Sequence, residues 1–101
     1  MDLKPTFKAK ITFHFSEHER KQLTFGPSLR QIIAAEIEGV EGLNSLAIFS
    51  RTEKTYLEND SDEFDCRSIV ESDFEKPFKV GAKGRLWAGA YFANLEVISV
   101  F

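Results

Sequence analysis

The segment from Phe7 to Phe15 alternates strictly between apolar and polar side chains. Its apolar members share one face of an extended chain: Phe7, Ala9, Ile11, Phe13 and Phe15. Lysine, threonine and histidine side chains occupy the other face. A period of two is typical of a strand with one buried and one solvated face, as antiparallel sheets provide. We therefore expect a half-buried antiparallel β-strand here.

The last part of the chain, residues 78–101, reads FKVGAKGRLWAGAYFANLEVISVF. Phe78 and Val80 share one face of a short extended segment, and Lys79 lies on the other. Residues 81–84 follow, and their glycines permit the positive φ angles that tight hairpin turns need. We therefore expect a closing β-hairpin with its turn at residues 81–84 and the longest strand of the protein after it.

This long second strand divides into two faces. The face expected to be buried carries Leu86, Ala88, Ala90 and Phe92. The opposite face carries Arg85, Trp87, Gly89 and Tyr91. Strict alternation would next bury Asn94 and Glu96, which are polar. A one-residue slip near Ala93-Asn94 buries Leu95 and Val97 instead, so we expect a β-bulge at that point.

Several short strand candidates lie between these two segments, separated by glycine and proline turns. Strands are expected at Leu23–Phe25, Leu46–Phe49 and Phe64–Val70, and Arg51–Glu63 is expected to form a long loop or an irregular hairpin. Many short strands at short spacing favour a small barrel or a sandwich. With 101 residues, the chain suits one domain that spans residues 1–101.

Residues Ser28–Gly39 fit two periods. Read as a helix, the segment has an apolar stripe of Leu29, Ile32, Ile33 and Ile37, with a serine cap and a glycine stop. Read as a strand, its apolar face is Leu29, Ile33, Ala35 and Ile37. The pattern alone leaves both alternatives open.

The composition excludes several classes of protein. The net charge of -3 leaves no overall basic footprint for nucleic acid. No apolar run approaches the roughly 20 residues of a membrane helix. The first residues lack the apolar core of a secretory signal, and the single cysteine, Cys66, has no internal disulfide partner. We therefore expect a cytoplasmic protein.

Candidate metal ligands are present at unsuitable spacings. His14 and His18 are spaced as on a helix, yet on a strand such positions lie about 13 Å apart. Asp60, Asp62 and Glu71 are spaced as in part of a calcium loop, but Asp65 stands where the loop needs glycine. We expect no metal site.

No catalytic constellation is visible in the sequence. Cys66 falls on the apolar face of its predicted strand without a partner base, and residues 16–19 supply no nucleophile, base and orienting group together. A phosphate-binding glycine loop that ends in lysine is also missing. We therefore expect no cofactor, no nucleotide binding and no enzymatic activity.

The closing segment resembles the end of the third domain of elongation factor Tu and related translational GTPases. The positions that match its pattern are Phe78, Val80, Gly84, Arg85, Ala88, Gly89, Ala90, Phe92 and Leu95. The segment departs from the family at Lys83, where the family has glycine, and at Ala88 and Ala90, which replace a Gly-x-Gly pair. Residues 7–15 are similar to the opening strand of that domain.

This resemblance implies a six-stranded antiparallel β-barrel and favours the strand for Ser28–Gly39. In the family the domain contacts tRNA and partner proteins and performs no chemistry. No family functional residue can be transferred to this chain. Our main hypothesis is a non-catalytic protein-binding module: a neutraliser such as an immunity protein or antitoxin, or a mimic of the elongation factor domain. The alternative is an RNA-binding accessory module.

Two groups of side chains are candidates for partner binding. Arg85, Trp87 and Tyr91 share the face opposite the predicted core, although burial of both aromatic rings under a loop or strand is the competing reading. Asp60 and Asp62 belong to an acidic run that would face a basic partner. For the RNA alternative, a local basic face would combine Lys8, Lys10, Lys79, Lys83 and Arg85.

Overall fold

The computed structural model describes residues 4–15, 21–26, 28–39, 42–50, 52–68 and 79–101. All regular elements in these ranges are β-strands: β1 (Phe7–Phe13), β2 (Gln22–Phe25), β3 (Ser28–Ile37), β4 (Leu43–Ser50), β5 (Lys54–Leu57), β6 (Ser61–Ser68), β7 (Lys83–Trp87) and β8 (Tyr91–Val100). None of the described residues forms a helix that could cross a membrane.

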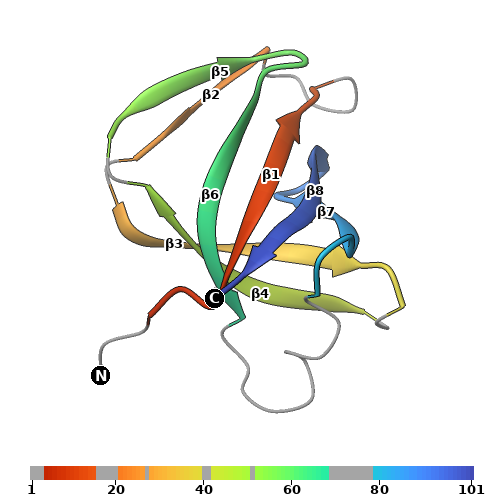
Figure 1. Ribbon diagram of the computed structural model, residues 1–101. Coiled ribbons are helices and arrows are strands. Elements are labelled where there is room, and N and C mark those ends of the chain that lie inside the picture. Colours follow the sequence, from red (N-terminus) through yellow and green to blue (C-terminus); the bar gives the residue numbers. More distant parts are fainter. Residues whose placement is uncertain (1–3, 16–20, 27, 40–41, 51, 69–78) are drawn as a thin grey trace.

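Six strands close into an antiparallel barrel in the order β1-β6-β4-β3-β7-β8, and β8 returns to pair with β1 (Figure 1). The two remaining strands, β2 and β5, form a separate antiparallel ribbon that arches beside the upper end of the barrel in this view. The predicted fold class, an all-β single domain with a small antiparallel barrel, is confirmed.

The barrel interior is filled from the alternating faces of its strands. The first strand behaves as predicted, because the whole apolar face of Phe7–Phe15 is buried. On β6 the inward residues are Phe64, Cys66 and Ser68, and on β4 Leu46 and Ile48 point inward. Val70, Phe78, His18 and Glu71, on which other predictions rested, lie outside the described residues.

Strand β3 resolves the ambiguity of Ser28–Gly39. It pairs with β4 on one side and with β7 on the other. Ile33 and Ile37 are buried, as either period requires, but Ile32 is 56% exposed. A helical stripe would bury Ile32, so the period of two holds and the segment is a strand. The backbone hydrogen bonds to β4 and β7 select the strand over the helix.

The described part of the segment expected to form a long loop or an irregular hairpin, residues 52–63, contains β5, a tight turn and the start of β6, so it is not a long loop. Strand β5 pairs with β2, while the following β6 pairs with β1 and β4. A tight turn joins them, in which the Asp60 amide donates to the Leu57 carbonyl and Asn59 has a φ of 70°. The acidic residues of this segment therefore belong to a junction between the ribbon and the barrel.

The closing hairpin exists, but its turn lies at residues 88–90 and not at residues 81–84. Gly89 has a φ of 81° and closes the connection between β7 and β8, where the Ala88 amide donates to the Ala90 carbonyl. Ala88 and Ala90 therefore lie in a surface turn, and their assignment to the core was wrong. Val80 is 67% exposed, which also corrects its predicted place on a buried strand face. The pattern misled because small residues suit both a bent strand and a tight turn.

The predicted slip on the last strand is confirmed one residue earlier. The pairing of β7 with β8 runs from Leu86 opposite Ala93 to Trp87 opposite Tyr91, so Phe92 is the additional residue of a bulge. Leu95 and Val97 consequently point into the barrel, as expected. Strand β8 was expected to be the longest in the protein, but β8 and β3 are each ten residues long.

An aromatic cluster joins the ribbon to the barrel. The Phe13 ring stacks on the Tyr56 ring of β5 with centroids 4.4 Å apart, and Phe25 of β2 lies 5.8 Å from Phe13. Phe64 packs edge-on against Phe13 and Tyr56. Since a two-stranded ribbon alone is marginally stable, this aromatic contact holds it in place.

Replacing Phe92 by alanine is expected to lower the free energy of unfolding by about 3–5 kcal/mol. Phe92 is buried beside Phe13, so its truncation is expected to leave a cavity in the core. Urea unfolding measures the loss. The exposed Val80→Ala is the control and should change stability by no more than about 0.5 kcal/mol. A loss below about 1 kcal/mol in Phe92→Ala would contradict the observed burial.

Candidate partner-binding surface

The outward face of β7 organises the candidate site. Alternation along this strand turns Lys83, Arg85 and Trp87 toward solvent, and Leu86 into the barrel. Because β7 lies between β3 and β8, each outward residue has neighbours on both strands. Arg85 is opposite Glu36 on β3 and Asn94 on β8.

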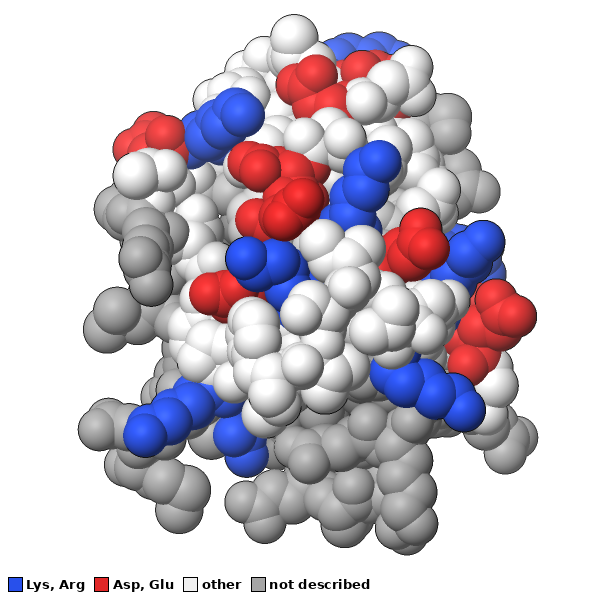
Figure 2. Space-filling view, viewed as in Figure 1, with Lys and Arg blue, Asp and Glu red and all other residues white. Residues whose placement is uncertain are grey.

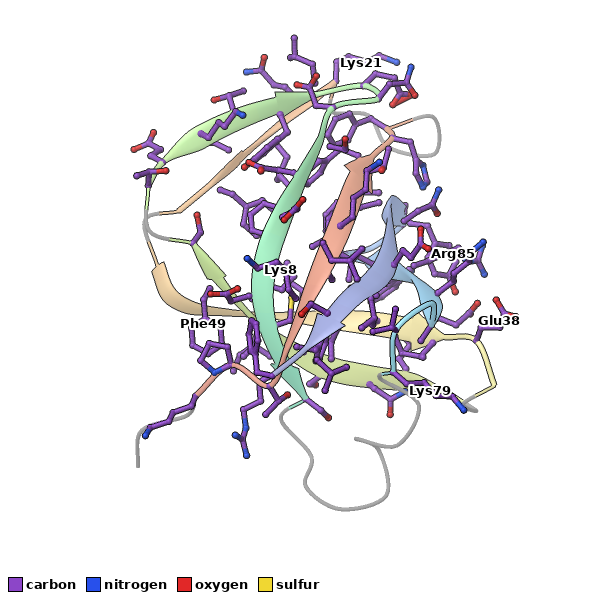
Figure 3. All side chains as sticks on the ribbon, in the orientation of Figure 1. Lys8, Lys21, Glu38, Phe49, Lys79 and Arg85 are labelled. Carbon is purple, nitrogen blue, oxygen red and sulfur yellow. The ribbon has the colours of Figure 1, made fainter. Side chains whose placement is uncertain are left out.

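Arg85, Tyr91 and Glu36 form a fixed polar cluster. The Arg85 Nη2 donates to Glu36 Oε1 at 2.6 Å, and the Tyr91 hydroxyl donates to Glu36 Oε2 at 2.7 Å. The guanidinium carbon of Arg85 lies 3.8 Å from the centre of the Tyr91 ring, within cation–π range. Both oxygens of the carboxylate are thus engaged, and the guanidinium is held against the aromatic ring. Figure 3 shows Arg85 projecting from the side of the barrel on which Glu38 also lies.

Trp87 lies at the surface beside this cluster. Trp87 is 38% exposed. Its backbone is opposite Tyr91 on β8 and Ala34 on β3. Trp87 is therefore not part of the buried core, and Tyr91 is half-buried. The structure places Arg85 and Trp87 on β7 and Tyr91 on β8, across the turn, and not on a single strand as predicted. Their part in binding stays a prediction.

Asp60 and Asp62 lie elsewhere and have structural partners. The Leu57 amide donates to Asp60 Oδ2 at 2.8 Å within the turn between β5 and β6. Asp62 Oδ2 accepts from the Tyr56 hydroxyl at 2.8 Å and lies 3.8 Å from Lys54 Nζ. Burial and the Asp62 carboxylate raise the pKa of Tyr56, so the phenol keeps the proton that it donates. Strands β8 and β1 separate this junction from β7 in the barrel order, so the structure does not unite the two predicted groups.

A shallow depression of about 580 Å³ lies next to the Arg85 cluster. Its lining comes from the neighbouring strands β1, β8, β7 and β3 and from the residue after β3: Lys10, Thr12, Glu36, Glu38, Lys83, Gly84, Arg85, Asn94, Leu95 and Glu96. Cations and carboxylates are mixed in this lining, and Figure 2 shows acidic and basic side chains interspersed over the visible face. Lys8, another member of the predicted basic face, lies 4.0 Å from Asp65. These cations therefore stand beside carboxylates.

The described residues contain no group of three or more histidine, cysteine, aspartate or glutamate side chains placed to hold a metal ion. Cys66 is buried in the barrel, as predicted, and burial raises the pKa of its thiol to about 12. A thiol with such a pKa stays protonated near neutral pH and is a poor nucleophile. The absence of enzymatic activity stays a prediction.

Sequence reasoning missed two residues that build this surface. Glu36 follows Ile32 and Ala34 on the outward face of β3, but only the register with β7 shows that it meets Arg85. Gly84 lies where β7 and β3 approach closely, because a Cβ there would lie 2.6 Å from the carbonyl oxygen of Glu36. The sequence places Gly84 in an expected turn and in the pattern of the resemblance, but not at a close approach of two strands.

Comparisons of the chain with protein-family models, with curated proteins and with solved structures return no match. The six-stranded antiparallel barrel is shown by the structure itself. A closer relationship to the third domain of elongation factor Tu stays a hypothesis.

Replacing Gly84 by alanine is expected to destabilise the protein by about 1–3 kcal/mol, because the added methyl group meets the Glu36 carbonyl and the Ile37 side chain. Chemical denaturation measures the loss. Lys83→Ala, on the same strand but exposed, is the matched control and should stay within about 0.5 kcal/mol of the original protein. An unchanged midpoint in Gly84→Ala would show that β7 can move away from β3 freely.

The hydrogen bonds from Arg85 and then Tyr91 lower the pKa of Glu36 below its ordinary value of 4.5. A lowered folded-state pKa adds stability above the unfolded-state pKa, and this stability is lost as the pH falls through the folded value. Carboxyl NMR titration of Glu36 should show its pKa rising toward 4.5 in Arg85→Ala, and rising less in Tyr91→Phe. An identical titration in Arg85→Ala would contradict the ion pair. The effect on unfolding should be small, since Glu36 is solvent-accessible.

Proposed function

We propose that this protein is a non-catalytic module that binds another protein through Trp87, Arg85 and Tyr91. The observation that carries the proposal is an exposed Trp87 beside a stacked arginine and tyrosine that Glu36 already holds. Tryptophan, tyrosine and arginine are the residue types most enriched among interface hot spots. The position of all three on one outward surface supports the proposal.

The rigidity of the cluster supports the same reading. Binding normally loses free energy when flexible side chains become ordered at an interface. Here Glu36 accepts hydrogen bonds from both Arg85 and Tyr91, so these two side chains are ordered before a partner arrives. Only the Trp87 ring and the partner then need to adjust. A small preorganised surface of this kind can bind specifically without a deep pocket.

A protein neutraliser is the form of the proposal that the composition supports best. The chain is short, carries a net charge of -3 and offers no catalytic constellation in its sequence. An immunity protein or antitoxin would need only such a stable, mildly acidic binding surface. The resemblance of residues 78–101 to the third domain of elongation factor Tu supports a second form, a mimic that docks where that domain would. Both forms place the module in the cytoplasm.

The RNA-binding alternative rests on the resemblance alone. Phosphate contact requires clustered lysine and arginine side chains. In the depression, Lys10, Lys83 and Arg85 share the lining with three glutamates, so the local charge is balanced. The arrangement therefore favours a protein partner.

Replacing Trp87 by alanine should leave the free energy of unfolding within about 0.5–1 kcal/mol, because the residue is a surface one. The same change should abolish stoichiometric capture of a partner from lysate by the immobilised protein. Leu57→Ala, an exposed apolar residue on β5, is the matched control and should capture normally. Nuclease treatment of the lysate separates a protein partner from one that RNA bridges.

The outcomes divide clearly. A partner that Trp87→Ala and the original protein capture equally would place the binding site elsewhere. Capture that disappears after nuclease treatment would favour the RNA alternative. A loss of about 3 kcal/mol or more in Trp87→Ala stability would mean that the ring is part of the core.

A further inference from the structure

Four exposed charged side chains form a row across the strands next to the Arg85 cluster. Lys10 of β1 is opposite Glu96 of β8, and Glu96 is opposite Lys83 of β7. Glu38 follows on, because its amide donates to the Lys83 carbonyl at 2.9 Å. The signs along the row are therefore positive, negative, positive and negative. With strands about 4.8 Å apart, the row is about 14 Å long.

The charges of this row are not used inside the described part of the chain. Among the described residues, none of the four makes an ion pair within 4.0 Å or a side-chain hydrogen bond. The neighbouring row differs, because Arg85 and Glu36 are closed on each other at 2.6 Å. All four residues line the depression and are exposed, so their charged ends are available to a second molecule.

We propose that this face binds a second copy of the same chain about a two-fold axis that runs parallel to the strands between β7 and β8. Such an axis reverses the order of the row, so the first member meets the fourth and the second meets the third. Lys10 then faces Glu38 of the other copy, and Glu96 faces Lys83. Every pair joins opposite charges, and each is made twice.

The next row fits the same axis. It runs Thr12, Asn94, Arg85 and Glu36 in strand order. The rotation brings the Asn94 amide opposite the guanidinium of the other copy, and the Thr12 hydroxyl opposite the Glu36 carboxylate. Both pairs match a donor with an acceptor. The depression provides space for the long side chains of the opposing copy.

The register of this interface is also specified. An axis shifted by half a strand spacing onto Glu96 would place that carboxylate against itself, and Lys10 against Lys83. An axis along the row would place each charge opposite its own copy. Like charges in contact disfavour both arrangements. The pattern therefore selects an axis that lies between two strands.

Purified single-charge variants test the proposal without any other partner. Because each exposed ion pair contributes little, we expect a weak dimer, with a dissociation constant on the order of 0.1–1 mM in low salt. Sedimentation equilibrium should show this dimer for the original chain, and added salt should weaken it. Lys83→Glu alone and Glu96→Lys alone should each weaken self-association by about tenfold or more, since two attractive contacts become repulsive.

Mixing the two variants is the decisive experiment. Lys83→Glu facing Glu96→Lys restores opposite charges at all four contacts, so the mixture should form a heterodimer although neither variant dimerises alone. Val80→Ala is a control outside the row and should leave the equilibrium unchanged. A monomer for the original chain at about 1 mM in low salt overturns the proposal. The proposal is also overturned if each variant associates as strongly alone as in the mixture. Either result would mean that the row acts only within its own sheet.

Discussion

The structure depends on the closure of the barrel by β7. With five residues, β7 is the shortest of the barrel strands in the described part of the chain. It pairs with β3 on one side and with β8 on the other. Closure requires a close approach at Gly84, where a side chain would meet the backbone of β3. Without that contact β3 and β8 would be open edges, whose unpaired backbone groups favour pairing with other chains.

The same strand also places the candidate surface. Inward Leu86 anchors β7 in the core, and alternation then requires Lys83, Arg85 and Trp87 to point outward. Arg85 meets Glu36 because β3 is antiparallel to β7 in a single register. A slip by one residue would exchange the two faces of β7 and bury the arginine. Stability and surface chemistry are therefore coupled through one short element.

Charges of opposite sign lie next to each other on neighbouring strands of this barrel. The chain has a modest net charge of -3, yet carboxylates and cations alternate across β1, β8, β7 and the end of β3. One neighbouring pair, Glu36 with Arg85, is closed and orders the stacked Tyr91. The others are open to solvent. The ordered aromatic surface, which we propose binds a partner protein, therefore adjoins the charged row, which we propose binds a second copy. Arg85 belongs to both surfaces, so the two binding events would compete at that residue.

The sequence by itself determined the β class, the first strand, which the structure bounds at Phe7–Phe13, and the inward places of Leu86, Phe92, Leu95 and Val97, because period-two burial is a local property of the chain. Only the tertiary structure decided that Ser28–Ile37 is a strand, since its apolar residues suit two periods and the pairing with β4 and β7 selects one. It also decided that residues 88–90, and not 81–84, form the hairpin turn, because both stretches contain the small residues that turns need. Glu36 beside Arg85 was likewise beyond the sequence: the two residues are 49 positions apart, and only the strand register brings them together.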